Sequence, residues 1–213
     1  MTFDPSTHLS AVERAVSLGE REGKPVRAVT LSRSFRATAP DLWDAVTNPE
    51  RLPRWFAPVS GDLEAGGRYQ VEGNAGGVIT ECERPSRFAL TWEFGEDVSW
   101  VEVSVSDEGA GRARLTLTHT MRPSDHWDTY GPGATGVGWE FGFLGLALYL
   151  ADPAAPRPDE AAFAASADGR AFGAGSSRGW ERAAVAAGAD PGAARMAAKR
   201  VTAFYTGEAA ESA

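Results

Sequence analysis

The chain contains very little cysteine: Cys82 is the single cysteine among 213 residues. One cysteine excludes an intrachain disulfide and a zinc site built on cysteine pairs, and it suits a reducing compartment. We therefore expect a cytoplasmic protein without disulfides. Because Cys82 falls among the apolar neighbours of a predicted strand, we expect its thiol to be inert.

Positive charge is also scarce. The sequence has 21 Lys and Arg residues against 29 Asp and Glu residues, which gives a formal net charge of -8 without a basic cluster. Nucleic acids and anionic membranes select for clustered Lys and Arg. We therefore expect neither a nucleic acid nor a membrane surface as a partner, and we favour small molecules or proteins.

Long apolar runs are missing as well. The longest apolar stretch, residues 136–151, has 16 residues and is interrupted by Glu140. A membrane-spanning helix needs about 20 apolar residues. Residues 1–18 lack the basic and apolar regions of a signal peptide, so we do not expect secretion.

The N-terminal part predicts short helices around one strand. Residues 5–18 place apolar side chains near one helical face, and residues 26–35 have the composition of a strand. A short helix is expected to begin after Pro40 and to end where Asn48-Pro49 forbids a further turn. A second short helix then carries Trp55 and Phe56.

An antiparallel meander of five strands follows, because turn-forming residues separate the apolar segments. The expected strands cover residues 67–72, 78–83, 88–94, 99–105 and 113–120. Alternation with a period of two places a mostly apolar set on one face, which must be covered. This set comprises Val78, Thr80, Cys82, Leu90, Trp92, Phe94, Val101, Val103, Val105, Leu115, Leu117 and His119.

A long helix over residues 136–151 is the expected cover. Gly138, Gly142 and Gly145 cost helix stability, by about 1 kcal/mol each relative to alanine. We expect them to allow a backbone or a ligand to approach closely. The alanine-rich tail predicts further helices at residues 160–167, 177–187 and 191–205, with a serine-capped turn at residues 173–177.

Several motifs together resemble one superfamily: Trp43 with Asn48-Pro49-Glu50, Trp55-Phe56, Gly66-Gly67 before Tyr69, Thr91-Trp92, residues 115–119, and Gly138-Trp139. In this order they resemble the START-like helix-grip (SRPBCC, polyketide cyclase-like) superfamily, and within it the branch of activator of Hsp90 ATPase homologues. The resemblance covers residues 26–151. It implies an α+β fold in which a curved antiparallel sheet of about six strands wraps a long helix. Residues 1–25 and 152–213 are then helical extensions.

The resemblance also implies a cavity between the sheet and the long helix. The aromatic residues between the sheet and the long helix then belong both to the core and to the wall of the cavity. Residues 124–130 form a loop at the cavity mouth. His119 can orient a ligand oxygen or act as a general base, or it is a buried histidine bonded to the backbone. The expected ligand-binding residues are Trp55, Phe56, Tyr69, Trp92, His119, Trp127, Tyr130, Trp139 and Phe143.

Other motifs carry no chemistry. His126 with Asp125 or Asp128 does not have a diagnostic metal spacing, so we expect no metal. Residues 131–138 are rich in glycine but lack the Lys-Ser/Thr end of a phosphate-binding loop. No cofactor motif is present, and no nucleophilic triad can be assembled.

Three functional hypotheses follow. The leading one is binding of a small hydrophobic or aromatic molecule in the cavity. The second is a polyketide cyclase or aromatase in which His119, Tyr69 or Tyr130 moves protons. The third is a module that stimulates a chaperone ATPase, as the branch name implies. The apolar tail also permits a homodimer.

Overall fold

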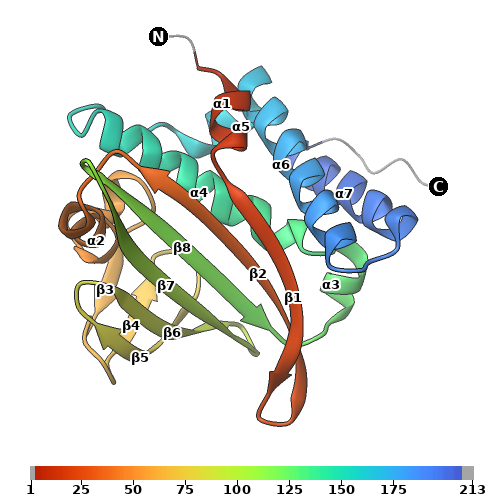
Figure 1. Ribbon diagram of the computed structural model, residues 1–213, viewed down its shortest axis with the longest axis horizontal. Coiled ribbons are helices and arrows are strands. Elements are labelled where there is room, and N and C mark those ends of the chain that lie inside the picture. The colour runs from red at the N-terminus through yellow and green to blue at the C-terminus, as the bar shows by residue number, and fades with distance from the viewer. Residues whose placement is uncertain (1–2, 208–213) are drawn as a thin grey trace. The chain divides into compact units, whose positions relative to one another are not determined.

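A computed structural model describes residues 3–207 (Figure 1). Its helices are α1 (Pro5–Ser10), α2 (Ala39–Thr47), the 3-10 helix η1 (Leu52–Arg54), α3 (Asp125–Tyr130), α4 (Gly133–Ala151), α5 (Glu160–Ala165), α6 (Ala167–Ala186) and α7 (Pro191–Thr206). Its strands are β1 (Glu13–Arg21), β2 (Lys24–Phe35), β3 (Val59–Gly61), β4 (Arg68–Val71), β5 (Gly76–Glu83), β6 (Arg87–Phe94), β7 (Asp97–Gly109) and β8 (Arg112–Met121).

The described residues form two compact units. Unit 1 combines residues from 1–31, 122–141 and 158–213, and unit 2 combines residues 32–121 and 142–157. The boundaries expected from the sequence, at residues 25/26 and 151/152, stay a prediction.

The expected antiparallel sheet is confirmed, with eight strands in place of about six. The strand order is β1-β2-β8-β7-β6-β5-β4-β3. In unit 2 the register pairs Leu90 with Val101 and Val101 with His119 across β6, β7 and β8. The meander expected over residues 67–120 is therefore present, and β1 and β3 are additional strands.

The prediction of a helix over residues 5–18 is correct only for its first residues. The helix α1 ends at Ser10, and residues 13–21 form β1. Only two residues, Glu22 and Gly23, separate β1 from β2, and both have positive φ (54° and 69°). Such a pair makes the tight turn that fits the twist of a hairpin, so strand pairing overrides the helical pattern of residues 11–18.

A β-bulge changes the face assignment on β5. The register shifts between Ile79 and Glu81, and Ile79 pairs with Leu90. Ile79 is therefore the buried residue, whereas the sequence placed Val78 and Thr80 on that face. One extra residue in a strand locally reverses which side chains are buried and which are exposed. The alternation of apolar and polar residues in the sequence does not reveal such a bulge.

Two predicted loops are helical. Residues 173–177, expected as a turn, lie inside α6, where Ser176 and Ser177 are fully buried. The Ser177 hydroxyl donates to the carbonyl oxygen of Gly173 (2.9 Å), so a polar residue is satisfied within the helix. Residues 125–130, expected as a loop, form α3, and Ser124 accepts the first amide hydrogen bond of that helix.

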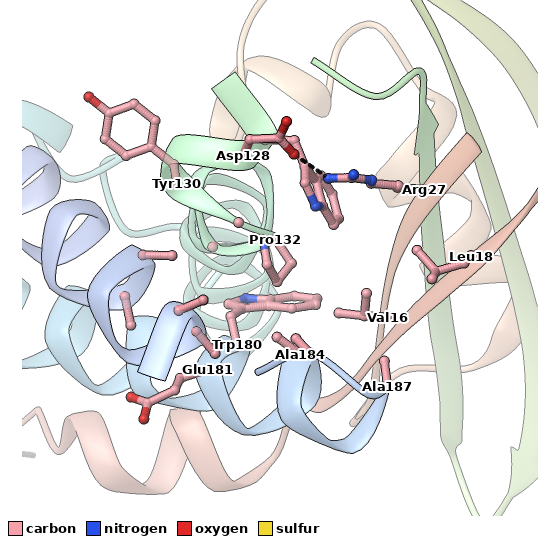
Figure 2. A pocket seen from close by; sticks show the side chains of 18 of the residues that line it. Val16, Leu18, Arg27, Asp128, Tyr130, Pro132, Trp180, Glu181, Ala184 and Ala187 are labelled. Carbon is pink, nitrogen blue, oxygen red and sulfur yellow. Dashed lines mark hydrogen bonds and ion pairs between the residues drawn. The ribbon is translucent and has the colours of Figure 1, made fainter. Parts of the chain in front are cut away.

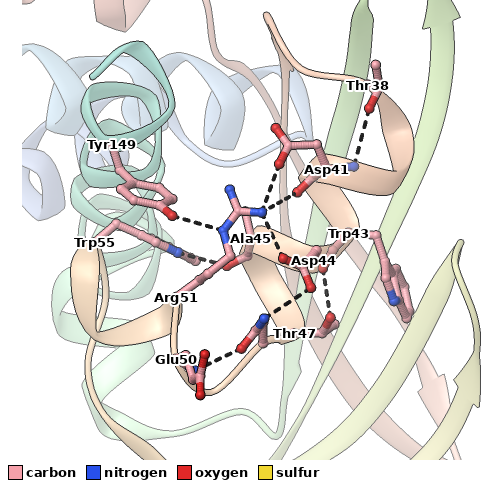
Figure 3. Close-up of polar contacts among 11 residues, drawn as sticks. Thr38, Asp41, Trp43, Asp44, Ala45, Thr47, Glu50, Arg51, Trp55 and Tyr149 are labelled. Atoms are coloured by element: carbon pink, nitrogen blue, oxygen red, sulfur yellow. Dashed lines mark hydrogen bonds and ion pairs between the residues drawn. The ribbon is translucent and has the colours of Figure 1, made fainter. Parts of the chain in front are cut away.

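A polar cluster joins the helices of unit 2 (Figure 3). The Arg51 guanidinium donates to the carboxylates of Asp41 (2.8 Å) and Asp44 (2.9 Å) in α2, and to the Tyr149 hydroxyl (2.9 Å) in α4. The hydrogen bond from Arg51 lowers the pKa of Asp44. The cluster thus fixes α2, the chain after it and the end of α4 together, beside Trp55.

The long helix α4 is close to its predicted position. Among residues 3–207 it is the one helix whose length and composition would let it cross a membrane, a test that buried core helices also pass. Of its glycines, Gly145 lies against the backbone of Trp55, where an added Cβ would be 2.6 Å from the carbonyl oxygen. Gly138 faces the Tyr205 hydroxyl, and Gly142 has open space around it.

Gly136 provides the tightest of these contacts. An added Cβ would lie 2.1 Å from Cε2 of Trp180, a buried residue of α6 in the same unit. Real Cβ atoms do not approach other atoms so closely, so glycine is required for the indole to lie on α4. No local pattern around Gly136 or Trp180 indicates this contact.

We predict opposite effects for two substitutions in α4. Gly136→Ala forces the Trp180 indole out of place and should lower the free energy of unfolding by about 1–3 kcal/mol. Gly142→Ala meets no neighbouring atom within 4 Å, and it should raise that free energy by up to about 1 kcal/mol through helix propensity. Urea denaturation of both variants checks the prediction, and shifts of the same sign would contradict it.

Candidate functional site

A partly exposed apolar face lies on the meander of unit 2. Tyr69, Val71 and Ile79 are buried at its base. Partly buried apolar residues pack against these three, namely Phe56, Ala57, Val59, Leu63, Cys82, Leu90 and Trp92. Apolar residues in the interior of a domain are normally covered on all sides. This set of half-buried apolar residues therefore marks a surface that can still accept a contact.

Strand β6 forms the most exposed row of this face. Phe88, Leu90 and Trp92 are half-buried, and Phe94 at the strand end is 63% exposed. Two of their partners on β7 are buried, because Val101 opposite Leu90 and Val103 opposite Phe88 are exposed by only 3% and 5%. Ser99, opposite Trp92, is half-buried. We name Phe88, Leu90, Trp92 and Phe94 the β6 row.

A polar pair, the buried His119 and the half-buried Ser99, lies beside the β6 row. The register places Ser99 opposite Trp92 and His119 beside Val101. The Ser99 hydroxyl oxygen lies 3.1 Å from the carbonyl oxygen of Trp92, and Nε2 of His119 lies 2.8 Å from the same hydroxyl oxygen. The Trp92 and His119 rings meet edge to face, with centroids 6.0 Å apart. The single hydroxyl proton of Ser99 serves either the Trp92 carbonyl oxygen or Nε2 of His119, so the tautomer of His119 sets the direction of the bond between Ser99 and Nε2.

Burial decides the charge of His119. The residue is 7% exposed, and desolvation lowers its pKa to about 4. The imidazole is therefore neutral at pH 7, and it can hold a hydrogen bond to Ser99 without introducing a charge into the apolar face. A base with this pKa is weak, so the environment suits orientation of a polar group better than proton abstraction.

Tyr69 is held in a similar way. Its hydroxyl donates to the carbonyl oxygen of Thr91 (2.7 Å), and burial together with the charge of Glu93 raises its pKa. A phenol with a raised pKa whose proton is already donated to the backbone is poorly placed to exchange protons with a ligand. Tyr69 therefore contributes apolar area and rigidity.

Three further predicted residues belong to unit 2. The Trp55 indole N–H donates to the carbonyl oxygen of Ala45 (2.9 Å), and the Trp55 and Phe56 rings lie 5.5 Å apart. Phe143 is buried and meets Phe35 edge to face. Phe56 thus borders the exposed face, whereas Phe143 is a core residue.

The other three predicted residues belong to unit 1. Trp127 and Tyr130 lie on α3, where Trp127 is buried, and Trp139 is half-buried on α4. Thus unit 2 contains Trp55, Phe56, Tyr69, Trp92, His119 and Phe143, and unit 1 contains Trp127, Tyr130 and Trp139. The nine residues remain a predicted binding set.

Sequence reasoning missed Ser99, although a signal for it was available. Alternation over residues 99–105 places Ser99 on the same face as Val101 and Val103, and the register of the structure pairs it with Trp92. A serine opposite a tryptophan on an apolar face is a polar group that must find a partner.

Acidic and imidazole groups do not gather into a metal site. Within residues 3–207 no group of three or more His, Cys, Asp or Glu side chains is close enough to hold an ion. His126 instead stacks near Tyr130, with ring centroids 4.9 Å apart.

We predict that His119 makes the protein acid-sensitive. A histidine whose pKa is lower in the folded than in the unfolded chain gives up stability as pH falls from about 6.5 to about 4, by about 3 kcal/mol for this difference. Above the unfolded pKa the effect is absent. Urea denaturation at pH 7 and pH 4 should therefore show a smaller loss in His119→Gln than in the natural protein.

The control is His126→Gln, which changes an exposed histidine of α3. This variant should retain the full loss of stability on acidification. Equal losses in the two glutamine variants would show that burial of His119 does not govern the pH dependence.

The chain is similar to known proteins of one fold. Residues 36–151 match the family described as Activator of Hsp90 ATPase homolog 1-like protein. The crystal structure of CalU16 from Micromonospora echinospora is 31% identical over 67% of this chain and 88% of its own, with a TM-score of 0.60. The solution structure of CalU16 is 25% identical over 93% of this chain and 94% of its own, with a TM-score of 0.63.

A more distant similarity supports the fold alone. DynU16, a protein in the dynemicin biosynthetic locus, is 22% identical over 62% of this chain and 50% of its own, with a TM-score of 0.54. No curated protein sequence matches the chain. Because the family match spans more than half of the 213 residues, the chain belongs to the Activator of Hsp90 ATPase homolog 1-like family of the helix-grip superfamily.

Proposed function

We propose that this protein binds a small hydrophobic or aromatic molecule against the β6 row of unit 2. The observation that carries the proposal is the uneven burial of this face. The β6 row is half-buried or exposed, although Val101 and Val103, the β7 partners of Leu90 and Phe88, are buried. An aromatic ligand placed there removes apolar surface from water and stacks on Trp92.

The polar pair gives such a ligand an orientation. The Ser99 hydroxyl lies between Nε2 of His119 (2.8 Å) and the carbonyl oxygen of Trp92 (3.1 Å). In either tautomer of His119 its oxygen keeps a lone pair that a ligand hydroxyl can use. Ligand sites commonly combine apolar walls with a few placed polar groups. A phenolic aromatic compound therefore fits this face better than an aliphatic chain.

Binding is favoured over catalysis by the states of His119 and Tyr69, two of the three predicted proton carriers. A cyclase-like reaction needs a group that exchanges protons near neutral pH. His119 has its pKa lowered to about 4, and Tyr69 has its pKa raised with its proton donated to the backbone. Neither environment is tuned toward pH 7.

Chaperone activation is a second candidate, supported by the description of the matched family. Its measurement is the ATPase rate of an Hsp90-type chaperone with and without the protein. Stimulation that survives Trp92→Leu would place that activity on a surface other than the β6 row.

The binding proposal predicts that 2-naphthol interacts with Trp92. The chain has seven tryptophans, so its indole N–H signals in a ¹H–¹⁵N spectrum report on separate places. A titration should move the Trp92 signal. Trp92→Leu should weaken the affinity at this face about fivefold or more, because aromatic pairs contribute about 0.5–1.5 kcal/mol beyond the area they bury. In this variant the backbone N–H signal of Ser99, which lies opposite position 92, should report the affinity at this face.

Trp100→Leu is the matched control. Trp100 lies on β7 between Ser99 and Val101, so alternation directs it to the opposite face of the strand. This variant should bind 2-naphthol with unchanged affinity. A Trp92 signal that stays in place at saturating 2-naphthol would contradict the proposal.

A further inference from the structure

A second concave site lies within unit 1 (Figure 2). Its volume is about 630 Å³, and its walls come from β1 and β2, from α3 and the turn after it, and from α6 and α7. Ligand sites typically have volumes of about 300–1,000 Å³. The pocket is therefore large enough for a small organic molecule.

Aromatic and small side chains line this pocket. The Trp127 and Trp180 rings and Pro132 form buried parts of the wall, and Trp180 is only 1% exposed. Open apolar surface comes from Leu18, which is 71% exposed, and from the half-buried Val16. Figure 2 shows Pro132 and Val16 drawn close to the Trp180 indole. The remaining helical wall consists largely of alanines, among them Ala184, Ala194 and Ala197. Alanine leaves the volume open where larger side chains would close it.

The charges at the pocket are balanced. The Arg27 guanidinium donates to the Asp128 carboxylate (2.8 Å) and lies 5.5 Å from the centroid of the Trp127 ring. Glu181, the other acidic wall residue, lies 3.8 Å from Arg195. A pocket whose cation is already paired offers no strong attraction for an anion. Its electrostatics favour a neutral molecule.

One polar group can give that molecule an orientation. The Asp128 carboxylate is 64% exposed, and its Oδ1 atom takes the bond from Arg27. A carboxylate has two oxygens and about four acceptor positions. It can therefore accept a further hydrogen bond from a hydroxyl at the pocket rim.

We propose that this pocket is a second ligand site, which takes a neutral planar aromatic molecule with a hydroxyl donor. Trp127, Val16 and Leu18 hold its rings, and Asp128 accepts a hydrogen bond from its hydroxyl. The segments β1, α6 and α7 fall outside residues 36–151, the part that matches the family. The site is thus mainly built by the terminal segments, and all its residues belong to unit 1.

The test uses 2-naphthol as a probe of this class. Titration of the full-length protein should shift the indole N–H signals of Trp127 and Trp180. Naphthalene-2-sulfonate has the same rings but carries a negative charge and no hydroxyl donor, so it should bind the pocket at least tenfold more weakly. Equal or tighter binding of the sulfonate would overturn the assignment of a neutral, donor-bearing ligand.

A substitution that places a large side chain in the pocket tests whether the probe binds there. Ala193 lines the pocket and is exposed on the first turn of α7, so Ala193→Phe should fill the pocket and weaken the response of Trp127 and Trp180 at least tenfold. Ala171→Phe is the matched control, because Ala171 is an exposed alanine of α6 outside the pocket lining. This control should respond as the natural protein does.

The remaining outcomes also decide the proposal. If saturating 2-naphthol leaves the Trp127 and Trp180 signals unchanged, or moves them equally in Ala193→Phe, the small-molecule site is wrong. If the same two signals shift with protein concentration alone and not with 2-naphthol, a second copy of the chain occupies the pocket instead. The Trp92 signal reports separately on the β6 row, so failure of one site does not imply failure of the other.

Discussion

The interior of unit 1 depends on one ion pair between a strand and the long helix. Arg14 of β1 donates from Nε and Nη2 to the two carboxylate oxygens of Glu140, both at 2.6 Å. The Glu140 side chain is fully buried and that of Arg14 is 10% exposed. Removing one partner of a buried pair leaves an uncompensated charge, which typically costs about 3–5 kcal/mol.

The same arginine also satisfies backbone groups that would otherwise lack donors. Its remaining donors reach the carbonyl oxygens of Val12 (2.9 Å) and Leu9 (3.1 Å), at the end of α1. Gly179 of α6 lies directly against the guanidinium, since an added Cβ would be 2.7 Å from Nε of Arg14. One side chain thus fixes α1, β1, α4 and α6 in unit 1. The sequence showed Glu140 only as an interruption of an apolar stretch.

Much of unit 2 could be predicted from the sequence because its signals are local. Alternation and turn residues determine β4 to β8, and Asn48-Pro49 ends α2 as expected. The failures arise where the pairing of two strands overrides the pattern within one segment. Residues 13–21 become a strand because β2 pairs with them, and the bulge after Ile79 depends on the register with β6.

The two candidate sites also differ in how far the sequence predicts them. Trp92 and His119 were placed on one face because both lie on alternating strands. The pocket of unit 1 could not be foreseen, because it is assembled from segments far apart in the chain and walled by alanines that carry no chemical signal. Trp127 and Tyr130 were recognised as binding candidates, but their partners on α6 and α7 were not.

The alanine walls of α6 and α7 affect how this protein can diverge in evolution. Alanine is the residue with the highest helix propensity, and exchanging it for leucine or methionine changes that propensity only slightly. Side chains can therefore grow into the pocket one at a time while the helices keep their backbone positions. Sister proteins can acquire different ligand preferences by such exchanges, with β1, α4 and the ion pair between them left unaltered.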